Sequence, residues 1–119
     1  MTRTRASAKA AGANFERVMA DFFAAEIDDR IDRRVKTGSA DKGDLGGMRI
    51  GKHRVVVECK NTSRINLAGW YAEAEAEAIN DGAEFKFVTF KRHGVSDPAR
   101  QWVLMSAADV ALLIREANR

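Results

Sequence analysis

The spacing of apolar side chains predicts an amphipathic helix near the start of the chain. Between residues 13 and 27 apolar side chains recur every three or four positions, the period of a helix with one buried face. Gly12 or Asn14 is suited to begin this helix. Residues 1–12 are basic and contain no apolar run, so they are interpreted as a flexible arm or, equally, as a frayed terminus, and not as a signal peptide. The apolar stripe consists of Phe15, Val18, Met19, Phe22, Phe23 and Ile27.

A change to a two-residue period predicts strands in the middle of the chain. Residues 30–37 alternate in polarity, and residues 38–44 form a loop that is rich in turn residues. A short strand is predicted over residues 45–50, interrupted by two glycines. The next two residues, Gly51 and Lys52, are typical of a hairpin turn before a strand over residues 54–60.

The second half of the chain continues this alternation of helix and strand. Asn66 is a suitable N-cap for a second helix, and Ser106 with Asp109 resembles a capping box before the last helix. The order α-β-β-β-α-β-β-α predicts an α/β fold with a mixed central β-sheet flanked by helices, in a single domain over residues 13–119. The elements of this half are expected at residues 67–80, 85–91, 101–105 and 107–117.

The distribution of charge favours an acidic partner. Residues 1–60 hold 13 Lys and Arg against 9 Asp and Glu, whereas residues 61–119 hold 7 against 8. Lys and Arg bind nucleic acid by neutralising phosphates and releasing counterions, so DNA is the expected partner. The single cysteine excludes an internal disulfide and favours a reducing cytoplasm, the host's if the protein is phage-encoded. No apolar run approaches the roughly 20 residues of a membrane span.

The strand expected at residues 54–60 carries the candidate chemistry. Side chains two residues apart in a strand share a face, so Glu58 and Lys60 project together while Cys59 points to the opposite face, into the core. The three valines before Glu58 indicate a mostly buried strand. Burial of a carboxylate or an ammonium costs on the order of several kcal/mol unless it is compensated. An isolated Glu-x-Lys pair is nevertheless more often a structural salt bridge than a site.

Asp44 changes that balance in favour of a functional site. It lies in a glycine-flanked turn, and the residues between it and Glu58 suffice for a hairpin that returns Asp44 beside Glu58. Two converging carboxylates form a hard-oxygen site that suits Mg²⁺ or Mn²⁺. The backbone carbonyl of Cys59 is a candidate for one further metal ligand.

These residues, Gly43-Asp44 and Glu58-Cys59-Lys60, resemble the two motifs of the PD-(D/E)XK nuclease superfamily. Glu16, on the first predicted helix, matches an additional acidic residue of many members. The resemblance covers nearly the whole chain and implies a restriction-endonuclease-like core. The chain departs from the family at Gly43, where a proline is usual. In size and layout it is most similar to the archaeal-type and phage Holliday junction resolvases, which are homodimers.

The resemblance implies a metal-dependent, structure-selective DNA endonuclease, and in particular a Holliday junction resolvase of DNA recombination and repair. Asp44 and Glu58 would hold Mg²⁺, with Mn²⁺ as a substitute. With this metal bound, the enzyme would hydrolyse phosphodiester bonds in branched DNA. Lys60 would orient or deprotonate water or hold the phosphate, and Glu16 would act through water or position the nucleophile. Two alternatives remain. The first is another nuclease of the superfamily, such as a repair enzyme, a restriction-like enzyme or an exonuclease. The second is a catalytically silent nucleic-acid-binding domain.

Other polar side chains are assigned by their place in the sequence. Basic and amide side chains near the site are candidates for DNA contact, although solvated surface residues would follow the same pattern. Glu73, Glu75 and Glu77 are interpreted as a solvated helix face; the alternative, that one of them approaches the site from the second helix, is not adopted as a prediction. The candidate DNA contacts are Arg33, Arg34, Lys36, Lys42, Asn61, Arg64, Lys91 and Arg92.

Overall fold

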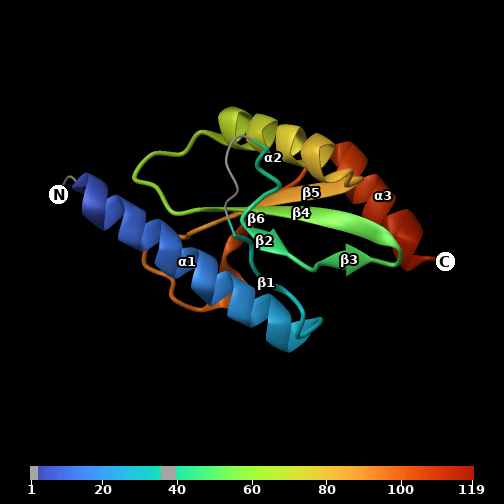
Figure 1. Ribbon diagram of the computed structural model, residues 1–119, viewed down its shortest axis with the longest axis horizontal. Helices are drawn as coiled ribbons and strands as arrows, with labels where there is room; N and C mark the ends of the chain where they lie inside the picture. The colour runs from blue at the N-terminus through green and yellow to red at the C-terminus, as the bar shows by residue number, and fades with distance from the viewer. Residues whose placement is uncertain (1–2, 36–39) are drawn as a thin grey trace.

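The computed structural model describes residues 3–35 and 40–119, which form an α/β fold around a mixed sheet (Figure 1). This confirms the fold class that the sequence predicts. None of the helices in the described ranges has the length and apolar character needed to cross a lipid bilayer. The elements are α1 (Arg5–Glu26), β1 (Asp32–Arg33), β2 (Leu45–Gly46), β3 (Arg49–Ile50), β4 (His53–Lys60), α2 (Leu67–Asp81), β5 (Phe85–Phe90), the 3-10 turn η1 (Pro98–Arg100), β6 (Trp102–Leu104) and α3 (Ala107–Ala117).

β4 lies at the centre of the sheet. The strand order is β1-β2-β4-β5-β6, and β3 pairs with the beginning of β4. β4 and β5 run parallel, with Glu58 opposite Val88, and the other pairs are antiparallel. A parallel pair needs a crossover connection, which α2 supplies. With α1 on one face and α2 on the other, helices cover both faces of β4, which explains its nearly continuous run of buried side chains.

The two faces of β4 pack against different helices, as Figure 1 shows for α1 and α2. On one face Val57 and Cys59 join the core cluster formed with α1, and Leu112 and Leu113 of α3 pack against that same cluster. On the other face α2 packs Trp70 and Ala74 against Val88 of β5. The alternation along the strand thus sends the Cys59 thiol into the core, as expected, and sends Glu58 towards α2.

α1 begins at Arg5, eight residues before the helix that the apolar stripe predicts. Thr4 is its N-cap, and its side-chain oxygen accepts a hydrogen bond from the Ser7 N–H at 3.1 Å. Most of the expected basic arm is therefore helical. An alanine-rich segment behind a threonine cap favours a helix even without an apolar face. The apolar stripe marks only the part of α1 that packs on the sheet.

Glycine divides the strand expected over residues 45–50 into β2 and β3. Gly47 lies between them with a positive φ of 88°, and a Cβ there would lie 2.5 Å from the carbonyl oxygen of Arg30. Only glycine fits this close approach of two backbones. In the described part of the strand expected at 30–37, pairing with β2 is limited to Asp32–Arg33, and residues 36 and 37 lie outside the described residues.

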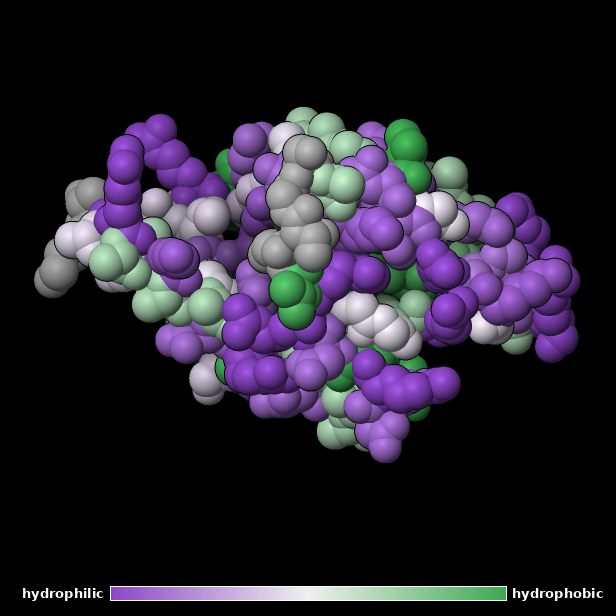
Figure 2. Space-filling model, in the orientation of Figure 1, coloured by the Kyte–Doolittle hydropathy of each residue, from purple (hydrophilic) through white to green (hydrophobic). Residues whose placement is uncertain are grey.

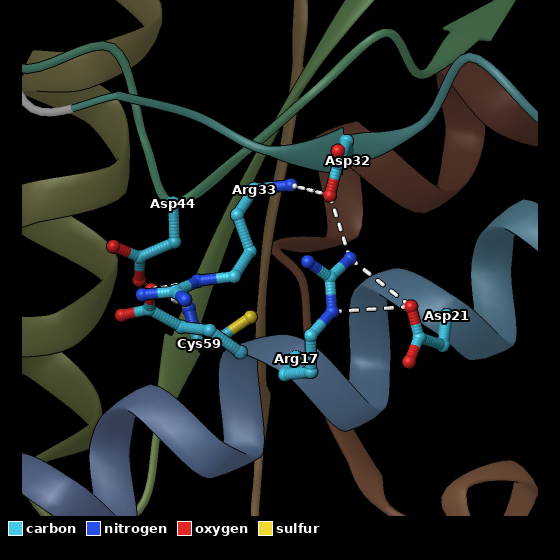
Figure 3. A network of polar contacts seen from close by, with 7 residues as sticks. Arg17, Asp21, Asp32, Arg33, Asp44 and Cys59 are labelled. Carbon is cyan, nitrogen blue, oxygen red and sulfur yellow. Dashed lines mark hydrogen bonds and ion pairs between the residues drawn. The ribbon is translucent and has the colours of Figure 1, made fainter.

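A network of charged side chains fastens β1 to α1 (Figure 3). The guanidinium of Arg17 lies 3.0 Å from a carboxylate oxygen of Asp21 and 2.6 Å from one of Asp32. The Asp32 carboxylate also accepts a hydrogen bond from the N–H of Arg33 at 2.7 Å. This network holds the short strand β1 against α1.

Candidate functional site

Pairing between β2 and β4 brings Asp44 to the middle of β4. Leu45 pairs with Val57, and the preceding N–H of Asp44 donates to the Val57 carbonyl at 2.9 Å. Its Oδ2 accepts a hydrogen bond of 2.8 Å from the Cys59 N–H. The Asp44 carboxylate is buried, and its charge acts directly on its neighbour Glu58. The hairpin inferred from the sequence therefore brings the two carboxylates together.

The backbone at Gly43 leaves no room for the proline that the resemblance would place there. Its φ is +96°, and its N–H donates to Oδ1 of Asp41 at 2.9 Å. Proline holds φ near −65° and has no N–H, so it is incompatible with this turn. A Cβ at Gly43 would also lie 3.0 Å from Cγ1 of Val56. In this fold, glycine is what allows the chain to deliver Asp44 against β4.

Glu58 is a buried acid surrounded by other charges. Only 4% of the residue is exposed. Burial raises the pKa of Glu58 to about 10, and the negative charges of Asp44 and Glu77 act in the same direction. Its Oε2 lies 3.3 Å from Nζ of Lys60. Without a further cation, the surroundings of this carboxyl group therefore oppose its negative charge.

Lys60 remains a cation. Burial lowers the pKa of Lys60, but the hydrogen bond to Glu73 and the charge of Glu58 outweigh burial, so the pKa is raised overall. The Nζ–Oε2 distance to Glu73 is 2.6 Å. The deprotonation of water, one of the roles expected for Lys60, therefore stays a prediction. The Lys60 ammonium group suits the binding of a phosphate oxygen.

Glu77 reaches the site from α2, contrary to its assignment to a solvated helix face. It is 5% exposed, on the same face of the helix as the buried Trp70 and Ala74. Burial raises the pKa of Glu77 to about 7, and the charge of Asp41 adds to this. Its helical spacing is the signal that would have revealed it, because residues three apart share a face and Ala74 belongs to the buried stripe. Glu75 does lie on the exposed face.

The carboxylates of Glu58, Glu73 and Glu77 form a cluster. One oxygen of each lies within 4.8 Å of the others. Within the described part of the chain, Oε1 of Glu58 and Oε1 of Glu77 are buried without a hydrogen-bond donor. Buried polar atoms without partners are costly, and oxygen ligands are those that Mg²⁺ and Mn²⁺ prefer. The donor set therefore fits a divalent cation.

Glu16 is not one of the three clustered acids. Oε1 of Glu16 lies 3.2 Å from Nε of Arg33, on the side of α1. The side chain of Cys59 lies in the core and its N–H is bound by Asp44. A role for Glu16 in positioning the nucleophile, and for the Cys59 carbonyl as a metal ligand, stays a prediction.

Asn61 and Lys91 are among the predicted DNA contacts that have polar partners within the protein. Asn61 accepts hydrogen bonds from the Arg3 guanidinium through its carbonyl (2.8 Å) and side-chain oxygen (3.2 Å). Nζ of Lys91 donates to two backbone carbonyls of the following loop, those of Arg92 and Val95. These contacts give Asn61 and Lys91 a structural role, and their contact with phosphate stays a prediction.

The remaining basic candidates differ in exposure. Arg33 is engaged by Glu16, and the guanidinium of Arg92 lies 3.9 Å above the ring of Trp102. Arg64 is exposed. Lys36 lies outside the described residues. Arg34 and Lys42 both line a cavity beside the beginning of β4.

The site combines three buried carboxylates, Asp44, Glu58 and Glu77, with one ammonium group, that of Lys60. Such an arrangement can hold a hard cation and place a positive charge beside it for an anionic substrate. Comparison of the chain with models of known protein families, with curated proteins and with solved structures found no match.

Proposed function

We propose that the protein is a metal-dependent endonuclease that hydrolyses phosphodiester bonds in DNA. The observation that carries this proposal is the position of Glu58, a buried carboxyl between Asp44 and Glu77, with an unpartnered oxygen and the Lys60 ammonium 3.3 Å away. If the site were only a structural salt bridge, a single acid would be enough to pair with Lys60. The site supplies an excess of acids, which is the condition for binding a divalent cation.

Glu58 and Glu77, whose oxygens cluster with one of Glu73, would hold Mg²⁺, or Mn²⁺ in its place, together with the neighbouring buried Asp44, whose charge acts on Glu58. A bound divalent ion supplies a water of lowered pKa and neutralises charge on the scissile phosphate. Lys60 leaves the half-exposed Glu73 and contacts a phosphate oxygen, where its fixed positive charge stabilises the transition state. Asp44 keeps its hydrogen bond to the Cys59 N–H, which fixes its orientation.

We propose branched DNA, in particular a four-way junction, as the substrate, and a homodimer as the active form. The order of motifs and elements supports this through the resemblance to junction resolvases. Exposed apolar side chains support an interface between two copies: Ile27 is 57% exposed and Val103 is 51% exposed. Both line an apolar cavity of about 310 Å³ between the end of α1, the sheet and α3. Exposed apolar patches of this kind mark interaction sites.

The substrate is tested with three labelled DNAs: a four-way junction, a linear duplex and a flap, each incubated with Mg²⁺ or with EDTA. Paired symmetric nicks in the junction alone, dependent on Mg²⁺, are the expected result. Cleavage of the duplex, the flap or DNA ends instead would assign the protein to another kind of nuclease. DNA binding without cleavage in either Mg²⁺ or Mn²⁺ would identify a silent binding domain and overturn the proposal.

A further inference from the structure

A second polar cavity opens where the beginning of β4 faces the C-terminal end of α2. Its volume is about 320 Å³. Figure 2 shows that hydrophilic side chains prevail on the face of the molecule that carries β3. Among the residues that the structure describes, four basic side chains and one acid, Asp81, line this cavity. The basic residues are Arg34, Lys42, Arg49 and Arg54, named below the basic pocket.

The single acid leaves most of this positive charge uncompensated. The Asp81 carboxylate lies 3.6 Å from the Arg34 guanidinium and 3.7 Å from that of Arg54, both beyond direct hydrogen-bond distance. The Arg54 guanidinium donates instead to the backbone carbonyl of Asp81 at 3.0 Å, a contact that leaves its charge unneutralised. Among the described residues, Lys42 and Arg49 form no ion pair. Four cations facing one carboxylate give the pocket a surplus of three positive charges.

The backbone holds two of these cations against each other. Arg49 of β3 pairs directly with Arg54 of β4 in an antiparallel register. Directly opposed residues on such strands project to the same face, and like charges there are destabilising. An anion between the two guanidinium groups would remove this repulsion.

Arg34 adds a hydrogen-bond donor without an acceptor to the basic pocket. Its Nε is buried and has no hydrogen-bond acceptor within residues 3–35 and 40–119. The guanidinium packs against Gly46, where a Cβ would lie 3.3 Å from Cζ. The loop that carries Lys42 is fastened to α2, because the Asn80 side chain donates to the Asp41 carbonyl at 2.8 Å. The pocket is therefore largely preformed.

We propose that the basic pocket binds a phosphate group, and that this phosphate belongs to the backbone of nucleic acid. Arginine donors in a fork and a lysine charge are the chemistry that recognises a phosphate oxyanion. Arg54 and Glu58 are four residues apart on one strand face, a separation of about 13 Å. The pocket would therefore hold a phosphate within a few nucleotides of the metal site.

The assignment of this phosphate to the cleaved DNA rests on the proposed nuclease function, whereas the anion site itself does not. The test therefore measures binding without cleavage, by anisotropy of a labelled duplex in EDTA over a range of KCl concentrations. The test variant is the double substitution Lys42→Gln with Arg49→Gln, which removes no ion pair of the described chain. The matched control is Lys52→Gln, an exposed lysine of the neighbouring hairpin turn.

The double variant is expected to bind the duplex about tenfold more weakly and to reduce the slope of log affinity against log salt by about 1. Lys52→Gln should stay within twofold of wild type. Equal affinities and slopes for the wild type and the double variant would overturn the proposal. Cleavage of junctions by a double variant that binds normally would leave the nuclease function standing without this pocket. If the double variant loses DNA binding and the wild type cuts no DNA, the basic pocket is supported and the nuclease function is not.

A second arm distinguishes nucleic acid from free phosphate. Inorganic phosphate is titrated into the wild type and the double variant, and binding is followed by calorimetry. Weaker phosphate binding by the double variant, together with its loss of DNA affinity, supports the proposal. Phosphate binding that the substitutions abolish while DNA affinity is unchanged would assign the pocket to a small phosphorylated ligand and overturn the assignment to the nucleic-acid backbone.

Discussion

Glu58 and Glu77 are acids whose surroundings oppose their charge. Both are buried, each keeps one oxygen without a hydrogen-bond donor in the described chain, and burial raises the pKa values of both. Compensation by a cation is the simplest physical reason for such an arrangement. The sequence indicated Glu58 through its place before Lys60. It did not indicate Glu77, because a run of alternating Ala and Glu is equally compatible with an exposed helix face.

Glu77→Gln is predicted to weaken the binding of Mn²⁺ at least tenfold, because it removes one charged oxygen ligand. Calorimetric titration of Mn²⁺ into the protein, without DNA, gives the affinity directly. Glu75→Gln is the matched control, because Glu75 is an exposed residue of the same helix. Equal affinities for the two variants would remove Glu77 from the metal site.

The stability of the metal-free protein is predicted to fall as the pH rises from about 5 to 8. The pKa values of Glu58 and Glu77 are raised from 4.5 to about 10 and about 7 in the folded state. Between 4.5 and those values the folded protein binds more protons than the unfolded chain, so unfolding becomes easier as the pH rises. Tm measured in EDTA at each pH tests this. Glu58→Gln with Glu77→Gln should flatten the dependence, and an unchanged slope would contradict it.

At the scale of elements, side-chain periodicity located those parts that pack through one face. The two-residue alternation placed Cys59 in the core and Glu58 on the opposite face, and α2 runs from Leu67 to Asp81, one residue beyond the expected end. The periodicity of apolar residues did not locate the segments whose structure does not depend on packing through one face. The first turns of α1 carry no apolar stripe, and β2 and β3 are separated by a backbone contact at Gly47 that leaves no pattern of polarity.

Gly43→Ala is predicted to lower the free energy of unfolding by about 1 to 2 kcal/mol, because it places a Cβ on a backbone with positive φ against Val56. Gly12→Ala should do the opposite and raise it by up to about 1 kcal/mol, since Gly12 lies inside α1 with open space around it. Urea denaturation of both variants measures these changes. A neutral Gly43→Ala would show that the turn before Asp44 tolerates a side chain.

At the scale of the whole molecule, the apolar cavity beside α3 is the surface we expect to join two copies. Val103→Glu places a charge at its rim, where Val103 is half-exposed, and is predicted to convert a dimer into a monomer without unfolding it. Light scattering at micromolar concentration measures the mass of the wild type and the variant. A wild type with the mass of one chain would contradict the homodimer, and a dimeric Val103→Glu protein would place the interface elsewhere.

The central claim is that Glu58, with its neighbouring acids and Lys60, forms the centre of a metal-dependent nuclease. The most direct test is the single-turnover rate of cleavage of a four-way junction in Mg²⁺ by the wild type, by Glu58→Gln and by the control Glu75→Gln. The wild type and Glu75→Gln should cut at the same rate, and Glu58→Gln should be at least a hundredfold slower while remaining folded by circular dichroism. A rate for Glu58→Gln within tenfold of the wild type would contradict the account.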